Sequence, residues 1–69
     1  MTRCWTAYIV YHPDYGYLST MAGNTIHWTS NIEVVWHWPE ISVSRVRQII
    51  PHPEKIILLD PIDCYMEDA

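Results

Sequence analysis

The segment that most constrains the fold of this 69-residue chain is Trp-Thr-Ala-Tyr-Ile-Val-Tyr at residues 5–11. Side chains alternate between the two faces of a strand, so the odd-numbered residues from Trp5 to Tyr11 would share one face and the even-numbered residues the other. Both sets are mainly apolar, which is typical of a central strand with packed neighbours. The sequence therefore predicts a sheet built around this segment.

Turn-forming residues divide the chain after this strand. His12 to Gly16 contains proline, aspartate and glycine, the residue types that favour a tight turn. We expect residues 17–21 to return antiparallel to the first strand. A second turn at residues 22–24 and a short strand at residues 25–28 would complete a three-stranded meander.

The middle of the chain is expected to be helical after a short irregular stretch. Capping residues at 29–31 predict a helical turn over residues 31–34, and residues 35–38 predict a brief strand. The main helix is expected over residues 39–50, because Pro39 suits a first turn and apolar residues recur at helical spacing. A strand is the alternative, since five of these twelve residues are Val or Ile.

A second apolar strand is expected at residues 55–59. Asp60 and Pro61 interrupt it and predict a bulge or an edge position, after which residues 62–65 resume pairing. Residues 66–69 form a short acidic tail. The element order predicts a single α+β domain over residues 1–69, with an antiparallel sheet of three to five short strands and one helix packed on one face.

The charge of the chain limits the classes of partner that it is expected to bind. The chain has four basic residues (Lys and Arg together) and eight acidic residues (Asp and Glu together), which gives a formal net charge of −4. Nucleic-acid binding is not expected, because it normally requires a basic patch. The sequence has no basic amphipathic helix and no apolar run of ~18 residues, so no membrane contact is expected. Residues 1–8 lack the features of a signal peptide, and we expect a cytoplasmic protein.

Cys4 and Cys64 lie near opposite ends of the chain. In a reducing cytosol we expect buried free thiols that behave as small apolar side chains. A disulfide that joins the first and last strands is the alternative, and it requires a close approach of the two Cα atoms.

The histidines do not follow a metal-binding motif. Their spacings of 15, 10 and 15 residues exceed the two to five residues that separate paired zinc ligands. We expect no metal; the alternative is a site that the fold assembles from His12, His52 and Asp14.

No catalytic constellation is evident either. Cys4 on a strand beside Trp5 would remain a protonated thiol. Asp60 and Asp63 are more simply explained by a kinked strand end than by a pair of hydrolase carboxylates. Two glycines in the whole chain make a phosphate-binding loop improbable. We therefore expect a protein that is not an enzyme and has no cofactor.

Four tryptophans and five tyrosines exceed what one small sheet and one helix can bury. We expect Trp5, Trp28 and one of Trp36 and Trp38 in the core. The other aromatic residues would lie on the surface, where Tyr and Trp favour interfaces because they combine large area with a polar tip. The residues predicted to bind a partner are Tyr11, Tyr15, Tyr17, Trp36 and Trp38.

One sequence pattern resembles a loose group of short proteins encoded by bacteriophages and prophages. The pattern joins Tyr8-Ile9-Val10, a Gly-Tyr-Leu hairpin return at 16–18, and a Trp-Thr-x-Asx element at 28–31, before a helix. The chain departs from it at Val35, where Ala is usual, and at Trp38, where Phe is usual. The resemblance implies an α+β fold and a phage context, in which small proteins bind host factors, defence systems among them.

Two functions follow from these observations. The first is a non-enzymatic interaction protein that binds and inhibits a bacterial host or defence protein through an aromatic-rich surface. The second is a nucleotide-binding protein, in which bases stack on aromatic rings for ~1–3 kcal/mol each. Arg45 or Arg47 would then hold a phosphate at a subunit boundary. We also expect a homo-oligomer, because a symmetric dimer pairs the same aromatic patch with itself.

Overall fold

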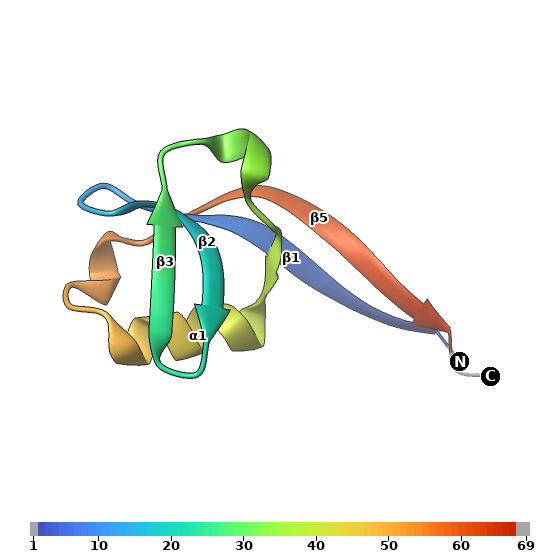
Figure 1. Cartoon of the computed structure of the whole chain (residues 1–69). Coiled ribbons are helices and arrows are strands. Elements are labelled where there is room, and N and C mark those ends of the chain that lie inside the picture. The colour runs from blue at the N-terminus through green and yellow to red at the C-terminus, as the bar shows by residue number, and fades with distance from the viewer. Residues whose placement is uncertain (1, 68–69) are drawn as a thin grey trace.

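The computed structural model describes residues 2–67 and contains a five-stranded antiparallel sheet with one α-helix on one face (Figure 1). The predicted α+β class is therefore confirmed. The elements, in chain order, are β1 (Thr2–His12), β2 (Gly16–Ala22), β3 (Thr25–Thr29), the 3₁₀ helix η1 (Ile32–Val34), β4 (Trp38–Pro39), α1 (Glu40–Ile49), the 3₁₀ helix η2 (Pro53–Lys55) and β5 (Ile57–Glu67).

β1 is the central strand, as predicted from its two apolar faces. β5 pairs antiparallel with it along one side, from Thr2↔Glu67 to Tyr11↔Ile57. On the other side, β4 pairs at Ala7 and Tyr8, and β2 pairs near the hairpin turn. β3 lies beyond β2. β1 is longer than the predicted 5–11 segment, because β5 supplies a hydrogen-bonding partner almost to its first residue.

The core lies between the sheet and α1. Val10 and Leu18 of the sheet and Val43 and Val46 of the helix are all fully buried in one cluster. Val43 and Val46 are three residues apart and so lie on one face of the helix, and the alternative of a strand at 39–50 is wrong. The even-numbered face of β1, which carries Val10, is therefore the inner face of the sheet.

A β-bulge in β5 is confirmed at the position that the Asp60–Pro61 pair predicts. Leu59 pairs with Ile9 and Ile62 pairs with Ala7, so Asp60 and Pro61 together stand opposite the single residue Tyr8. Asp60 has a φ of 48°, a left-handed conformation that Asp tolerates better than most residues. The extra residue reverses the alternation of side chains. As a result, Leu59 and Ile62 point to the same outer face of the sheet.

β1 and β5 extend beyond the other strands as a two-stranded arm, formed by residues 2–7 and 62–67 (Figure 1). The molecule is accordingly elongated, with principal dimensions of 41 × 24 × 21 Å. The last part of the arm includes Met66 and Glu67, which pair with Arg3 and Thr2. Residues 68 and 69 of the expected acidic tail lie outside the described residues.

The segment between β3 and α1 is mostly irregular. The predicted helical turn is present as η1, and the Asn31 side chain caps it by accepting a hydrogen bond from the Glu33 N–H. The brief strand expected at 35–38 is shorter and later, because only Trp38 and Pro39 pair with β1. Residues 31–37 therefore form an ordered loop beside the sheet.

Gly16 is the glycine that the hairpin requires. Its φ is +101°, and a Cβ atom at this position would lie 2.7 Å from the backbone oxygen of Thr29. Replacing Gly16 with Ala therefore imposes both backbone strain and a clash with backbone, and we expect a loss of roughly 2–4 kcal/mol in the free energy of unfolding. Urea denaturation measures this loss directly.

Gly23→Ala is the matched control for this prediction. Gly23 also has a positive φ, of +59°, but a Cβ atom there meets nothing within 4 Å. The expected loss is about 1–2 kcal/mol, from backbone conformation alone. Equal losses in the two variants would show that the close approach of Gly16 to Thr29 is unimportant.

Candidate interaction surfaces

The tyrosines around the first hairpin separate onto two faces of the sheet. Tyr11 and Tyr17 are directly opposite each other, with ring centroids 4.8 Å apart, and both are half-buried. They share the outer face, because Tyr11 is odd-numbered in β1. Tyr15 lies elsewhere, with its ring centroid 4.4 Å from that of His12 and 5.3 Å from that of Trp28. The three predicted tyrosines therefore do not form one patch.

His12 is fully buried and joins the hairpin turn to the loop before β5. Its Nε2 donates to the backbone oxygen of His52 over 3.1 Å, because a carbonyl can only accept. Its Nδ1 accepts from the Asp14 N–H, also over 3.1 Å. Each ring nitrogen thus makes one hydrogen bond in a single neutral tautomer. His12 therefore has a structural role, because it connects the hairpin turn to the loop before β5.

The residues of the alternative metal site are engaged in other contacts. His52 Nδ1 lies 3.3 Å from the Glu54 carboxylate, and Lys55 donates to Asp14 over 3.2 Å. The pKa of Glu54 is lowered, mainly by a backbone hydrogen bond and then by His52 and Lys55. Within residues 2–67, no group of three His, Cys, Asp or Glu side chains is arranged to hold a metal ion.

Replacing His12 with Ala should destabilise the protein strongly. The change removes a buried ring from against Tyr15 and Trp28, and it leaves the His52 carbonyl and the Asp14 N–H without partners. We expect a loss of about 2–4 kcal/mol in the free energy of unfolding, measured by urea denaturation. His27→Ala is the control, because His27 is exposed on β3 and its loss should cost less than ~0.5 kcal/mol. Similar losses for both variants would contradict the structural role of His12.

The two cysteines are free, and the register shows why the alternative disulfide is wrong. Cys4 pairs with Tyr65, whereas Cys64 pairs with Trp5. Residues directly opposite each other share a face, so Cys4 and Cys64 point to opposite faces of the arm. Burial, which we expected for both thiols, is partial at Cys64 on the outer face and absent at Cys4, which lies on the inner face beyond α1.

The tryptophans divide between core and surface, with one correction to the sequence-based expectation. Trp28 and Trp38 pack against the core, and the Trp38 indole donates to the Leu18 carbonyl over 3.3 Å. Of the pair Trp36 and Trp38, one was expected in the core. Trp38 is that residue, and Trp36 lies on the surface, where it is 67% exposed. Trp5 was expected in the core, and this is wrong: it is 39% exposed, because it lies on the outer face of the arm, opposite the face that α1 covers.

The 31–37 loop presents three exposed apolar side chains at two-residue spacing, namely Ile32, Val34 and Trp36. It stands at one side of the molecule between β3 and β4 (Figure 1). The loop is held at its start, where the Asn31 N–H donates to the Thr29 hydroxyl and the Asn31 side chain caps η1. At its end, His37 Nε2 lies 3.0 Å from the Asp60 carboxylate in the bulge of β5.

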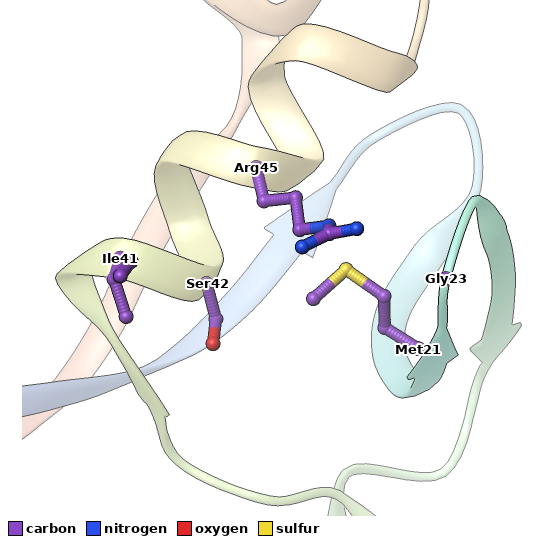
Figure 2. A pocket seen from close by; sticks show the side chains of 5 residues that line it. All are labelled: Met21, Gly23, Ile41, Ser42 and Arg45. Atoms are coloured by element: carbon purple, nitrogen blue, oxygen red, sulfur yellow. The ribbon is translucent and has the colours of Figure 1, made fainter.

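The predicted arginines do not act together. Arg45 lines a shallow pocket of about 310 Å³ with Met21, Gly23, Ile41 and Ser42. Figure 2 shows the Arg45 guanidinium reaching from α1 toward the Met21 side chain of β2. Arg47 is exposed and does not line this pocket. In the part of the chain that is described, no ion pair includes either arginine, and no aromatic ring lines the pocket.

Sequence reasoning missed several exposed apolar residues. Ile32 and Val34 escaped notice, although apolar residues at every second position from 32 to 36, around the short turn η1, were a usable signal. Tyr65, which is 66% exposed on the arm, gave no such signal. Its exposure depends on how far β5 runs past α1, which the tertiary structure alone decides.

No family model, curated protein or solved structure matches this chain. Among residues 2–67, none of the helices has both the length and the apolar character needed to cross a bilayer.

Proposed function

We propose that this chain is a non-enzymatic interaction protein that binds another protein through Ile32, Val34 and Trp36 of the 31–37 loop. The observation that carries the proposal is the 67% exposure of Trp36, the largest side chain type, at the end of a row of exposed apolar residues. Exposed apolar side chains that gather in one segment, as these three do, mark interaction sites more often than apolar side chains that are exposed singly. Tryptophan in particular is enriched among the residues that dominate binding energy.

The support for the loop comes from the hydrogen bonds at its ends as well as from its exposure. Hydrogen bonds at Asn31 and at His37 fix both ends of the loop to the sheet. A loop that is ordered before binding loses little conformational entropy when a partner covers it. Binding residues are commonly placed on such loops above a rigid scaffold. The loop therefore supplies an apolar anchor that is already in a fixed geometry.

The partner in this proposal is a bacterial host or defence protein that the chain inhibits in the cytosol. The support for this part is the resemblance to short phage-encoded proteins. The apolar anchors imply a groove or pocket on the partner that is lined by apolar side chains. The proposal also includes self-association, through a surface other than the loop.

Replacing Trp36 with Ser should remove this binding without unfolding the protein, because the indole lies mainly in solvent. Immobilised protein should retain a stoichiometric partner from a bacterial lysate, and calorimetry with that partner should show a loss of about 30-fold or more in affinity for Trp36→Ser. Tyr65→Ser is the matched control, since Tyr65 is 66% exposed and lies on the arm. Unchanged binding by Trp36→Ser, or equal losses in both variants, would overturn the proposal.

A second candidate function is the binding of a small phosphorylated ligand, and the pocket beside Arg45 favours it. Arg45 has no carboxylate partner among the described residues, and Ser42 adds a hydroxyl group to the same pocket. An arginine that is free of carboxylates is suited to a phosphate group. Base stacking has no support in this pocket, because its lining lacks aromatic residues.

A thermal-shift screen with mononucleotides and cyclic oligonucleotides tests this second candidate. If Arg45 holds a phosphate, a ligand should raise the melting temperature of the wild type and of Arg47→Gln, but not of Arg45→Gln. At a ligand concentration of about 100 times Kd, the stabilisation should be near 3 kcal/mol, which is a rise of about 10 °C or more. Stabilisation that survives in Arg45→Gln, or none with any ligand, rejects the candidate.

A further inference from the structure

Within the described chain, one edge of β5 pairs with no other strand. β1 is the only strand that pairs with β5 in residues 2–67, and no backbone hydrogen bond joins β5 to any other segment of that part of the chain. In an antiparallel pair, every second residue directs both its N–H and its C=O away from the neighbouring strand. Such an edge is a template for pairing with another chain.

Residues 62–67 are the part of this edge that can accept a further strand. Pro61 has no N–H to donate, and the bulge at Asp60 and Pro61 interrupts the edge before Ile62. Beyond the bulge, β5 pairs regularly with β1 as far as Glu67, over six residues that span about 20 Å. In Figure 1 this part of β5 projects beyond β2, β3 and α1, so the rest of the domain leaves room beside it.

The charge of β5 selects the strand that can pair there. Its sequence contains three acidic residues, Asp60, Asp63 and Glu67, and no basic residue. Opposite charges on neighbouring strands stabilise the pair and like charges destabilise it, so a second β5 is disfavoured and a basic strand is favoured. The other edge of the arm, residues 2–6 of β1, carries Arg3 as its one charged residue and does not favour a basic strand.

Asp63 and Tyr65 provide a place for a cationic side chain on the inner face of the arm. They pair with Thr6 and Cys4, which puts the two side chains on the same face, and both are exposed. The exposed fraction of Tyr65 is 66%, because the residue lies beyond α1. A Lys or Arg side chain on an adjacent strand can pair with the Asp63 carboxylate and lie against the Tyr65 ring.

The outer face of the same stretch favours apolar neighbours. Ile62 and Cys64 lie on this face, opposite Ala7 and Trp5. Ile62 is 39% exposed, so an apolar side chain on an added strand would cover more of it. Because side chains alternate between faces, a strand that suits both faces alternates basic and apolar residues.

We propose that residues 62–67 of β5 bind an extended segment of another protein, in which Lys or Arg alternates with apolar residues, as a third strand of the arm. Main-chain hydrogen bonds supply the affinity, and the alternating side chains supply the specificity. The added strand also stabilises a ribbon that two strands leave marginally stable. This edge is separate from the 31–37 loop, so the inference goes beyond the proposed function and either can fail alone.

A fluorescent peptide of the sequence Val-Lys-Val-Lys-Val-Lys is the probe, titrated with protein up to about 1 mM and followed by polarisation. The wild type and Trp36→Ser should bind this peptide, and neither should bind the same peptide with Glu in place of Lys. Asp63→Lys should weaken binding by at least about 5-fold, because it sets like charges side by side. No binding by the wild type, or equal binding of the Lys and Glu peptides, overturns the proposal.

Glu33→Lys is the matched control for the charge change. Glu33 is exposed in η1, away from the arm, and the substitution alters the net charge by the same amount as Asp63→Lys. It should change the affinity for the peptide by less than about 2-fold, because exposed charges farther apart than a Debye length are largely screened. Circular dichroism checks that each variant is folded. Equal losses in the two variants, or unchanged binding by Asp63→Lys, overturn the proposal.

Hydrogen exchange of the backbone amides tests the strand pairing itself. Saturating peptide should slow exchange at alternate amides within residues 62–67 by at least about 10-fold, because these N–H groups then donate to the added strand. β3 is the control, since it is another edge strand of the sheet and has no acidic residue. Slowing in β3 instead of β5, or binding without slowing in β5, overturns the proposal. Slowing at 62–67 that accompanies dimer formation without peptide also overturns it, because a second copy then occupies the edge.

Discussion

The structure depends on the burial and pairing of β1. Its inner face carries Val10, which joins Leu18, Val43 and Val46 in the fully buried cluster under α1. Its edges bind β5 along one side and both β2 and β4 along the other. A chain this short buries only ~60% of the surface that its unfolded form exposes, so one central strand must organise almost all of the core. The remaining elements are placed by their contacts with it.

The bulge at Asp60 links this core to the surfaces that face solvent. It reverses the alternation of β5 and thereby keeps Ile57, Leu59, Ile62 and Cys64 on the outer face. It also positions the Asp60 carboxylate 3.0 Å from Nε2 of His37. Because β4 and β5 pair with opposite edges of β1, this contact reaches across β1. One extra residue in a strand therefore shapes the outer face of the arm and fixes one end of the 31–37 loop.

The exposed apolar residues fall into separate groups with different surroundings. Ile32, Val34 and Trp36 stand on a loop whose ends are hydrogen-bonded, whereas Trp5 and Ile62 lie on an arm that has no covering layer. The pocket beside Arg45 is a third feature, between α1 and the β2–β3 turn. These three features therefore lie on different elements of one small domain.

The sequence by itself determined the α+β class, the hairpin at His12–Gly16, the helix ended by Pro51, the capped turn after Asn31 and the bulge at Asp60. These features follow from local chemistry: fixed φ at proline, free φ at glycine, capping side chains and apolar spacing. Only the tertiary structure decided that Trp5 is exposed, that Tyr11 and Tyr15 lie on different faces, that Cys4 and Cys64 cannot meet, and that Arg45 and not Arg47 lines a pocket. Those outcomes depend on which residues of β5 pair with β1 and on how α1 and the turns pack against the sheet, which are non-local facts that residue type and spacing do not encode.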